Sequence, residues 1–342
     1  MPHENFINVK NWITEIINQP RRIAIPILTH PGIEMIGKTV LDAVTDGKVH
    51  AEAIKVLNNR YPSAASTVIM DLTVEAEAFG CVIDFSENEV PTVKHRLVSN
   101  FEEVQQLPVP SLSAGRVPQY LLANQLTAAA ISGKPVLGGC IGPYSLAGRL
   151  FDMTEIMMAI YTEPETIHLL LEKCTQFLTE YCHALKDAGA DGVIIAEPAA
   201  GLLSNDDCLQ YSSHYVKQII DILQDDNFSV ILHNCGNTGH CTQAMLYTGA
   251  HGYHFGNAMN MIDALEICPP DVLVMGNLDP VSVFKMSTPE QVKQSAMNLL
   301  EKTAGYKNFV LSSGCDVPPQ TSLENVAAFY EALEEFNNGI TE

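Results

Sequence analysis

Short apolar runs rich in β-branched residues recur along the whole chain, and a segment with helical periodicity separates each run from the next. Near-continuous apolar runs are typical of strands buried on both faces of a parallel sheet. Eight alternating strands and helices predict a (β/α)8 TIM barrel, and the alternative is an open, doubly wound sheet. No run is followed by a G-x-G-x-x-G turn or a P-loop, which argues against the alternative. The predicted strands are residues 22–28, 67–70, 135–139, 192–196, 229–233, 252–255, 271–275 and 308–312.

The longest helical segment, Pro164 to Ala188, carries apolar residues at i, i+3, i+4 and i+7 spacing and stops at Gly189. Cys174 lies in that apolar stripe, so we expect it to be a core residue. An N-terminal helical extension over about residues 4–19 is predicted to precede the barrel.

Two capping boxes mark the starts of further helices. They are Thr288-Pro289-Glu290-Gln291 and Thr321-Ser322-Leu323-Glu324. The length of the chain lies within the range of single barrels, and no linker rich in Pro, Gly or Ser divides it. We therefore expect residues 1–342 to form one domain.

The charge balance restricts the partners. The chain has 40 Asp and Glu against 19 Lys and Arg, for a net charge of −21. Without a basic cluster, such a chain is not expected to bind nucleic acid or an anionic membrane. The N-terminus lacks the pattern of a signal peptide, no run of 18 apolar residues occurs, and the nine cysteines lack the spacing of a disulfide framework. These features predict a cytoplasmic protein.

Unusual polar residues follow the predicted strands. The active sites of (β/α)8 enzymes lie at the carboxyl ends of the strands, where the loops converge. Asp71 is as readily explained as a helix cap, and Asn277 and Asp279 as local turn residues before a proline. Glu197 at a strand end is more readily explained by function. The residues at these positions are Asp71, Gly142, Pro143, Glu197, His233, Cys235, His254, Asn277, Asp279 and Cys315.

Three of these residues form a candidate metal site. His233 and Cys235 stand two residues apart at one strand end, and Cys315 follows the last predicted strand. A lone buried His or Cys is usually a core residue, but three such ligands on one rim favour zinc with an open fourth position, which is the catalytic arrangement. The 80-residue separation of the cysteines excludes a zinc knuckle, and a C-x-x-C redox motif is absent. Cys140, Cys208, Cys241 and Cys268 are interpreted as structural.

Several motifs of the chain resemble those of a known family. His233-x-Cys235 and the later Cys315 in SSGCDVPP, with MDLTVEAEAFG, AEPAAGLLS and MGNLDP in order, resemble the uroporphyrinogen decarboxylase superfamily and, within it, the zinc-dependent methylcobamide:coenzyme M methyltransferases. The resemblance implies a (β/α)8 barrel with Zn²⁺ held by His233, Cys235 and Cys315. It also implies a methylated corrinoid on a carrier protein as methyl donor.

The sequence departs from the decarboxylase branch of this superfamily. That branch carries paired arginines in an N-terminal R-Q-A-G-R segment, whereas the matching stretch here, ILTHPGIEMIG, contains none. Cobalamin-independent methionine synthase, a more distant relative, places a Glu between the zinc-binding His-x-Cys and Cys. The matching GYHFGNAMNM has no acid, so His254, water or the substrate could supply a fourth ligand.

The implied reaction moves a methyl group to a small thiol such as coenzyme M, because a thiolate is the effective nucleophile and zinc favours its formation. Glu197 or Asp71 could accept the thiol proton, and Arg149 in GPYSLAGRL could hold an anionic group of the acceptor, although a surface or salt-bridge role is also open for it. Asn277, Asp279 and His254 are candidates for contacts with the substrate or the corrinoid. The alternatives are porphyrinogen decarboxylation, methyl transfer to a homocysteine-like thiol or tetrahydrofolate, zinc-dependent hydrolysis, and non-catalytic corrinoid binding.

Overall fold

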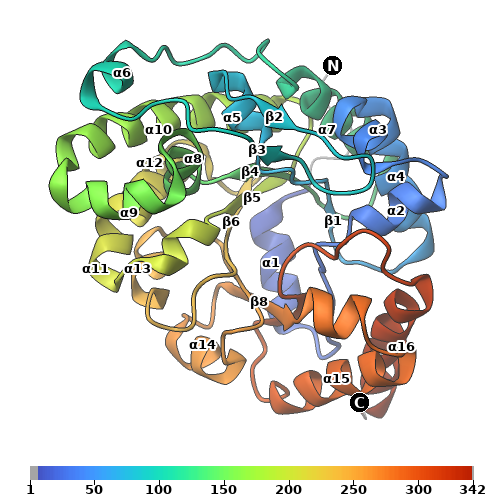
Figure 1. The fold of residues 1–342 in the computed structure, drawn as a ribbon. Helices are drawn as coiled ribbons and strands as arrows, with labels where there is room; N and C mark the ends of the chain where they lie inside the picture. The colour runs from blue at the N-terminus through green and yellow to red at the C-terminus, as the bar shows by residue number, and fades with distance from the viewer. Residues whose placement is uncertain (1–6, 341–342) are drawn as a thin grey trace.

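A curled parallel sheet forms the centre of the protein, and helices surround it (Figure 1). The computed structural model describes residues 7–340. The seven strands are hydrogen-bonded in the order in which they follow one another along the chain, so neighbours in sequence are neighbours in space. They are β1 (Ser66–Thr67), β4 (Val136–Ile141), β5 (Gly192–Ala196), β6 (Ser229–Asn234), β7 (Gly252–Phe255), β8 (Leu273–Leu278) and β9 (Phe309–Ser313).

Helices precede, connect and follow the strands. They are α1 (Val9–Asn18), α2 (His30–Met35), α3 (Val40–Thr45), α4 (Gly47–Arg60), α5 (Val74–Phe79), α6 (Phe101–Gln106), α7 (Val117–Ala130), α8 (Pro143–Phe151), α9 (Met153–Thr162), α10 (Pro164–Asp187), α11 (Asn205–Cys208), α12 (His214–Leu223), α13 (Thr242–Tyr247), α14 (Met261–Ile267), α15 (Pro289–Lys302) and α16 (Leu323–Gly339). A 3₁₀ turn η1 (Pro198–Leu202), two π-helical turns, η2 (Leu209–Ser213) and η3 (Pro280–Lys285), and a small antiparallel pair, β2 (Ile83–Asp84) with β3 (Thr92–Val93), complete the described elements.

The first predicted strand, residues 22–28, is not a regular strand. Ala24 makes a single parallel bridge to Leu311 of β9, and on its other side its carbonyl accepts a 2.9 Å hydrogen bond from the backbone of Ala64, just before β1. Pro26 lacks the N–H group that a regular ladder needs. The prediction of eight regular strands in a closed barrel is therefore wrong for this segment, and the described residues form a curled sheet of seven strands.

The second predicted strand, residues 67–70, is also shorter than expected. β1 ends at Thr67, and the backbone N–H of Ile69 donates to Nε2 of His50 at 2.9 Å instead of joining a strand. A side chain has taken the place of a sheet partner. By contrast, β5 and β7 match the predicted strands residue for residue.

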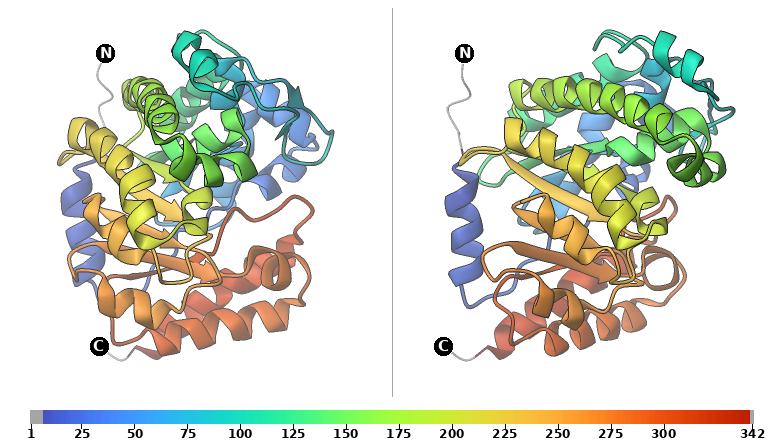
Figure 2. Two further views of the ribbon diagram at one scale, coloured as in Figure 1. Left: turned by 60° about the vertical axis from the view of Figure 1, so that its left-hand side comes forward. Right: turned by 90° about the vertical axis from the view of Figure 1, so that its left-hand side faces the viewer.

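Two apolar layers hold the sheet. The inner cluster joins Ile13 and Ile16 of α1 to side chains from the first half of most strands, including Leu137, Ile194 and Ile231. Figure 2 shows α1 packed across one end of the strands. A larger outer cluster lies between the sheet and the surrounding helices, and it includes Cys174 as a fully buried core residue, as predicted.

Most of the helix predictions are confirmed. α10 begins at Pro164 as expected, and Thr288 forms the predicted capping box with Gln291. The last helix starts one residue later than predicted, because its N-cap is Ser322, whose hydroxyl accepts from the backbone of Asn325 at 3.3 Å. The predicted N-terminal helix is present as α1, and residues 4–6 of that prediction lie outside the described residues.

Within residues 7–340, no helix combines the length and the apolar character needed to cross a lipid bilayer.

Candidate metal centre

His233, Cys235 and Cys315 meet at the carboxyl end of the sheet. His233 is the second-last residue of β6, and Cys235 follows that strand directly. Cys315 stands two residues beyond the end of β9. One ligand atom from each lies within 4.8 Å of the other two. His233 is 2% exposed, whereas both cysteines are partly exposed. The cluster therefore joins an enclosed histidine to two cysteines that are only partly exposed, and its role in metal binding stays a prediction.

One ring nitrogen of His233 is free for a ligand. Nε2 is buried and has no hydrogen-bond partner among the described residues. A buried polar atom without a partner is costly, so such an atom indicates a ligand or a bound solvent molecule. Two thiols with one imidazole nitrogen are a donor set that zinc prefers. The residues present thus fit the predicted zinc ion.

The two thiols of the cluster are electrostatically unlike. A hydrogen bond from the Cys315 thiol lowers the pKa of Cys235, whereas that same contact and burial raise the pKa of Cys315 above its usual range. Gly256 allows this arrangement, because a Cβ atom there would overlap the backbone of Cys235.

His254 lies behind His233 rather than beside the thiols. The Nδ1 atoms of the two rings are 2.7 Å apart, and Nε2 of His254 lies 2.8 Å from the hydroxyl of Ser312. Burial, followed by the neighbouring His233, lowers the pKa of His254 well below the usual value, so its ring is neutral. Both nitrogens have partners, and the structure does not bring His254 into the ligand set.

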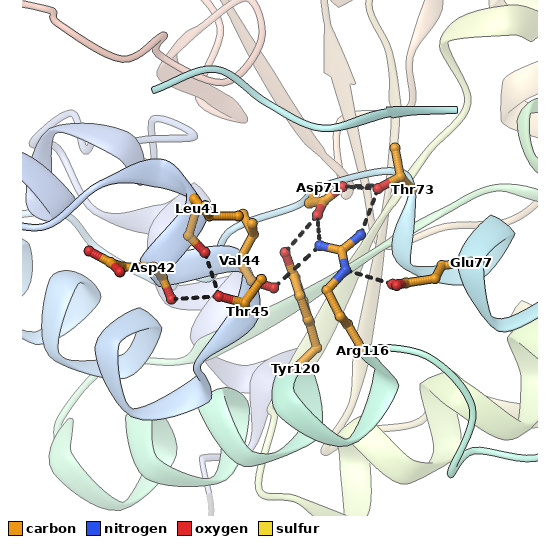
Figure 3. Close-up of polar contacts among 9 residues, drawn as sticks. All are labelled: Leu41, Asp42, Val44, Thr45, Asp71, Thr73, Glu77, Arg116 and Tyr120. Atoms are coloured by element: carbon orange, nitrogen blue, oxygen red, sulfur yellow. Dashed lines mark hydrogen bonds and ion pairs between the residues drawn. The ribbon is translucent and has the colours of Figure 1, made fainter. Parts of the chain in front are cut away.

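Asp71 belongs to a buried ion-pair cluster (Figure 3). One carboxylate oxygen accepts from Arg116 and, at 3.1 Å, from the hydroxyl of Tyr120, and the other accepts from the backbone and hydroxyl of Thr73. The guanidinium of Arg116 also donates to Glu77 at 2.6 Å. Burial raises the pKa of Asp71 and Arg116 opposes that shift. The partners of both oxygens are already supplied by the protein.

Glu197 is enclosed at the start of α8. Its Oε1 accepts from the backbone N–H groups of Tyr144 at 2.9 Å and Ser145 at 3.4 Å, and its Oε2 accepts from the hydroxyls of Ser145 and Ser212. Burial raises the pKa of Glu197 to about 7, against these hydrogen bonds. An acid at a helix N-terminus satisfies free backbone donors. The sequence candidates Gly142 and Pro143 form this same helix start.

Asn277 and Asp279 hold the loops that follow β7 and β8. Nδ2 of Asn277 donates to the carbonyls of Gly256 at 2.8 Å and Met259 at 2.6 Å. Asp279 accepts from two backbone N–H groups at the start of η3 and from Nδ2 of Asn257 at 3.0 Å. These contacts agree with the structural explanation given for both residues from sequence.

Arg149 is half-buried on α8. No ion pair or hydrogen bond is formed by its guanidinium within residues 7–340. Burial lowers the pKa of Arg149, and Glu75 and Asp71 lie close enough to oppose that shift. Oε2 of Glu75 is likewise buried without a partner, and burial raises the pKa of Glu75 to about 7. The guanidinium of Arg149 and Oε2 of Glu75 are thus two polar groups without a hydrogen-bond partner among the described residues.

Sequence reasoning missed His30, which follows the first predicted strand. Its Nδ1 lies 3.2 Å from a carboxylate oxygen of Asp316, the residue after Cys315, and its Nε2 is buried without a partner among the described residues. Thr29 donates to the same carboxylate. The Thr-His pair directly after an apolar run was the available signal.

The fold is that of an α/β protein with a curled parallel sheet, and the candidate site lies at the carboxyl ends of its strands. The chain belongs to the uroporphyrinogen decarboxylase (URO-D) family, whose model matches residues 20–336. It is 29% identical over 301 residues to the methylcobamide:CoM methyltransferase MtbA of Methanosarcina acetivorans, covering 84% of this chain and 86% of that protein. It is 26% identical to the uroporphyrinogen decarboxylase of Alcanivorax borkumensis, covering 81% and 80%.

Solved structures show the same fold. A methyltransferase from Methanosarcina mazei superposes with a TM-score of 0.85 at 24% identity, covering 97% of this chain and 99% of that one. A putative vitamin-B12 independent methionine synthase from Listeria monocytogenes gives a TM-score of 0.56 at 12% identity, covering 95% and 100%.

Proposed function

We propose that this enzyme transfers a methyl group from a methylated corrinoid, carried by a partner protein, to a zinc-activated thiol such as coenzyme M, and that residues 1–342 act as one domain. The observation that carries the proposal is the cluster of His233, Cys235 and Cys315 with its free, buried Nε2. The similarity to a methylcobamide:CoM methyltransferase over most of both chains supports it.

Zinc held by these three residues would favour the thiolate form of an added thiol at neutral pH. Because Cys235 and Cys315 are partly exposed, a small thiol can approach the cluster from solvent. The sulfur electron pair then forms a bond to the methyl carbon. The carbon–cobalt bond breaks with its electron pair left on cobalt, and the thiol proton goes to solvent or to a nearby base.

The base that accepts the thiol proton could be Asp71 or Glu197, and the hydrogen bonds of both residues limit this role. The oxygens of Asp71 and Glu197 already accept hydrogen bonds from Arg116, Thr73, Tyr144 and other groups, so each would have to exchange a partner to reach a substrate. Arg149 keeps a free guanidinium and is the better candidate for an anionic group of the acceptor. These roles stay part of the proposal, as do contacts of Asn277 and Asp279 with substrate. His254 is fully buried and has partners for both ring nitrogens, so it offers no free group to a substrate.

A carrier protein needs a docking surface over the strand ends. Several large apolar side chains in the segments that follow the strands are exposed, and exposed apolar groups of this kind mark interaction sites. They are Val82 (60%), Phe85 (39%) and Val90 (46%) after β1, Leu202 (58%) after β5, and Val281 (49%) and Met286 (76%) after β8. Their position around one end of the sheet supports docking of a protein there.

Decarboxylation of a porphyrinogen is the second candidate, because relatives in the same family carry that name. The segment that replaces the paired arginines contains His30, and the ring of His30 is already bound to Asp316. Arg116 is likewise held by Asp71 and Glu77. The described residues of this region thus offer few free cations to a substrate rich in carboxylates, which favours methyl transfer.

The test is thiol-dependent demethylation of methylcobalamin, followed by the loss of its absorbance. Zinc-loaded protein should transfer methyl to coenzyme M or another small thiol, whereas metal-free protein and the Cys315→Ala variant should not. Cys268→Ala, at a buried cysteine outside the cluster, is the matched control and should retain transfer. Equal rates with and without zinc, or in Cys315→Ala, would contradict the proposal. Assays with homocysteine and tetrahydrofolate distinguish the acceptors.

A further inference from the structure

A buried chain of hydrogen bonds runs from His233 to a backbone carbonyl. Nδ1 of His233 lies 2.7 Å from Nδ1 of His254, and Nε2 of His254 lies 2.8 Å from the hydroxyl of Ser312. That hydroxyl donates to the carbonyl of Ile25 at 2.8 Å. His254 and Ser312 are 0% exposed, so solvent does not compete for any of these contacts.

The position of each proton follows from the last acceptor in this series of hydrogen bonds, the carbonyl of Ile25. A backbone carbonyl only accepts, so the single hydroxyl proton of Ser312 is committed to Ile25. Toward His254 the hydroxyl can then only accept, which places an N–H on Nε2 of His254. No carboxylate among the described residues pairs with this ring, and a fully buried ring without a counter-charge is neutral. Its Nδ1 is therefore an acceptor.

His233 must supply the remaining proton. Two imidazole nitrogens 2.7 Å apart need one hydrogen between them, and Nδ1 of His254 has none. Nδ1 of His233 thus carries the N–H, and its Nε2 carries a lone pair. This is the nitrogen that is buried without a partner in the metal cluster.

We propose that His254 and Ser312 are positioning residues that fix the tautomer of His233, so that Nε2 presents its lone pair to the metal. The inference rests on the proposed function for the identity of that metal. Metal-binding histidines generally donate their second N–H to a carboxylate, a carbonyl or water. Here the neutral imidazole of His254 accepts that N–H, and its own orientation is fixed through Ser312 by the Ile25 carbonyl. We call this chain of hydrogen bonds the relay. It adds no negative charge next to the two cysteines.

The relay predicts a graded effect on metal affinity. His254→Leu removes the acceptor for Nδ1–H, and we expect zinc affinity to fall about 10- to 100-fold, the usual effect of losing an outer partner. His254→Gln keeps an amide oxygen for His233 and an N–H for Ser312, so it should bind zinc within about threefold of wild type. Ser312→Ala should lie between them.

The chain offers a matched control at the opposite end of the same strands. His251, just before β7, shares a 3.0 Å hydrogen bond with Ser229, the first residue of β6. His251→Leu therefore removes a histidine of the same pairing type from the same sheet without touching the cluster. Its zinc affinity should equal that of wild type.

Zinc affinity is measured by competition with a chelating indicator, and the tautomer by ring ¹⁵N shifts of histidine in zinc-free protein. The ¹⁵N shifts should show the proton of His233 on Nδ1 in wild type and a mixture of tautomers in His254→Leu. The relay is overturned if wild type carries that proton on Nε2, or if His254→Leu binds zinc as tightly as wild type. The wild-type spectrum decides the question even if a variant fails to fold. Wild type that binds no zinc would instead contradict the proposed function.

Discussion

The carboxylate of Asp71 and the guanidinium of Arg116 form an ion pair that is almost completely withdrawn from solvent, with 0% and 8% of the two side chains exposed (Figure 3). Arg116 precedes α7, whereas Asp71 precedes α5, so the pair joins two segments that are 45 residues apart in sequence. Val44 at the end of α3 adds its carbonyl to the same guanidinium at 3.3 Å. The pair thus fixes three connections on one side of the sheet.

The Arg116→Met variant is expected to lose about 3–5 kcal/mol of unfolding free energy, because it leaves the buried carboxylate of Asp71 without its counter-charge. The double variant Asp71→Asn/Arg116→Met should recover part of that loss. Urea denaturation at pH 7 measures both. Lys55→Met, which breaks the exposed pair with Glu52, is the control and should change stability by less than about 1 kcal/mol. Equal losses for Lys55→Met and Arg116→Met would contradict this assignment.

His50 should make the protein sensitive to acid. Burial, with a contribution from His30, lowers the pKa of His50 to about 3. As the pH falls below about 6.5, His50 binds a proton in the unfolded chain but not in the folded chain. The contribution of His50 to the unfolding free energy is therefore fully present above about pH 6.5 and is lost as the pH falls toward 3. This group alone should cost about 2 kcal/mol between pH 6.5 and pH 5.

The variant that tests this effect is His50→Gln, whose amide oxygen can still accept from the backbone of Ile69. Its unfolding free energy should change less between pH 7 and pH 5 than that of wild type, by about 2 kcal/mol. His183→Gln, at an exposed histidine, should keep the wild-type pH dependence. A slope in His50→Gln equal to that of wild type would show that another group is responsible.

The elements predicted correctly from sequence are those whose signal is local. The strand at residues 192–196 is an uninterrupted apolar run, and the capping box at Thr288 needs only four residues. The segment at residues 22–28 has the same apolar character, yet Pro26 interrupts its hydrogen bonding. The early end of β1 could not be predicted, because it depends on a hydrogen bond to His50, which lies on α4.

The same distinction holds for the site. His233, Cys235 and Cys315 could be grouped from sequence, because parallel strands of a curled sheet end on one rim. The partners behind them could not, since Ser312 and Ile25 look like ordinary strand residues until β9 lies beside residues 22–28. Arg116 gave no signal either, because it follows no predicted strand.

The contact between Gly142 and Glu197 predicts a steric limit. A Cβ atom at residue 142 would overlap the carboxylate of Glu197, which is held at the start of α8. Gly142→Ala should therefore lower the unfolding free energy by about 1–3 kcal/mol, as overpacking generally does. Gly305→Ala, at a glycine whose added Cβ would meet open space, should be tolerated. Thermal unfolding of the two variants compares them directly, and equal midpoints would show that Glu197 can move aside.

A substitution among the exposed apolar residues after β8 should weaken the reaction with the methylated carrier protein but not the reaction with free methylcobalamin. Val281 on η3 and Met286, which directly follows η3, are 49% and 76% exposed beyond the end of β8. A charge there would be buried when a carrier protein docks, so Met286→Glu should raise the KM for the methylated carrier about tenfold, which corresponds to ~1.4 kcal/mol of binding. The rate with free methylcobalamin should stay unchanged, because the small donor needs no contact with η3. Ile222→Glu is the matched control, since Ile222 is 66% exposed near the end of α12, where the chain returns to the amino end of β6. If Met286→Glu and Ile222→Glu have the same KM for the carrier, the carrier does not dock over η3.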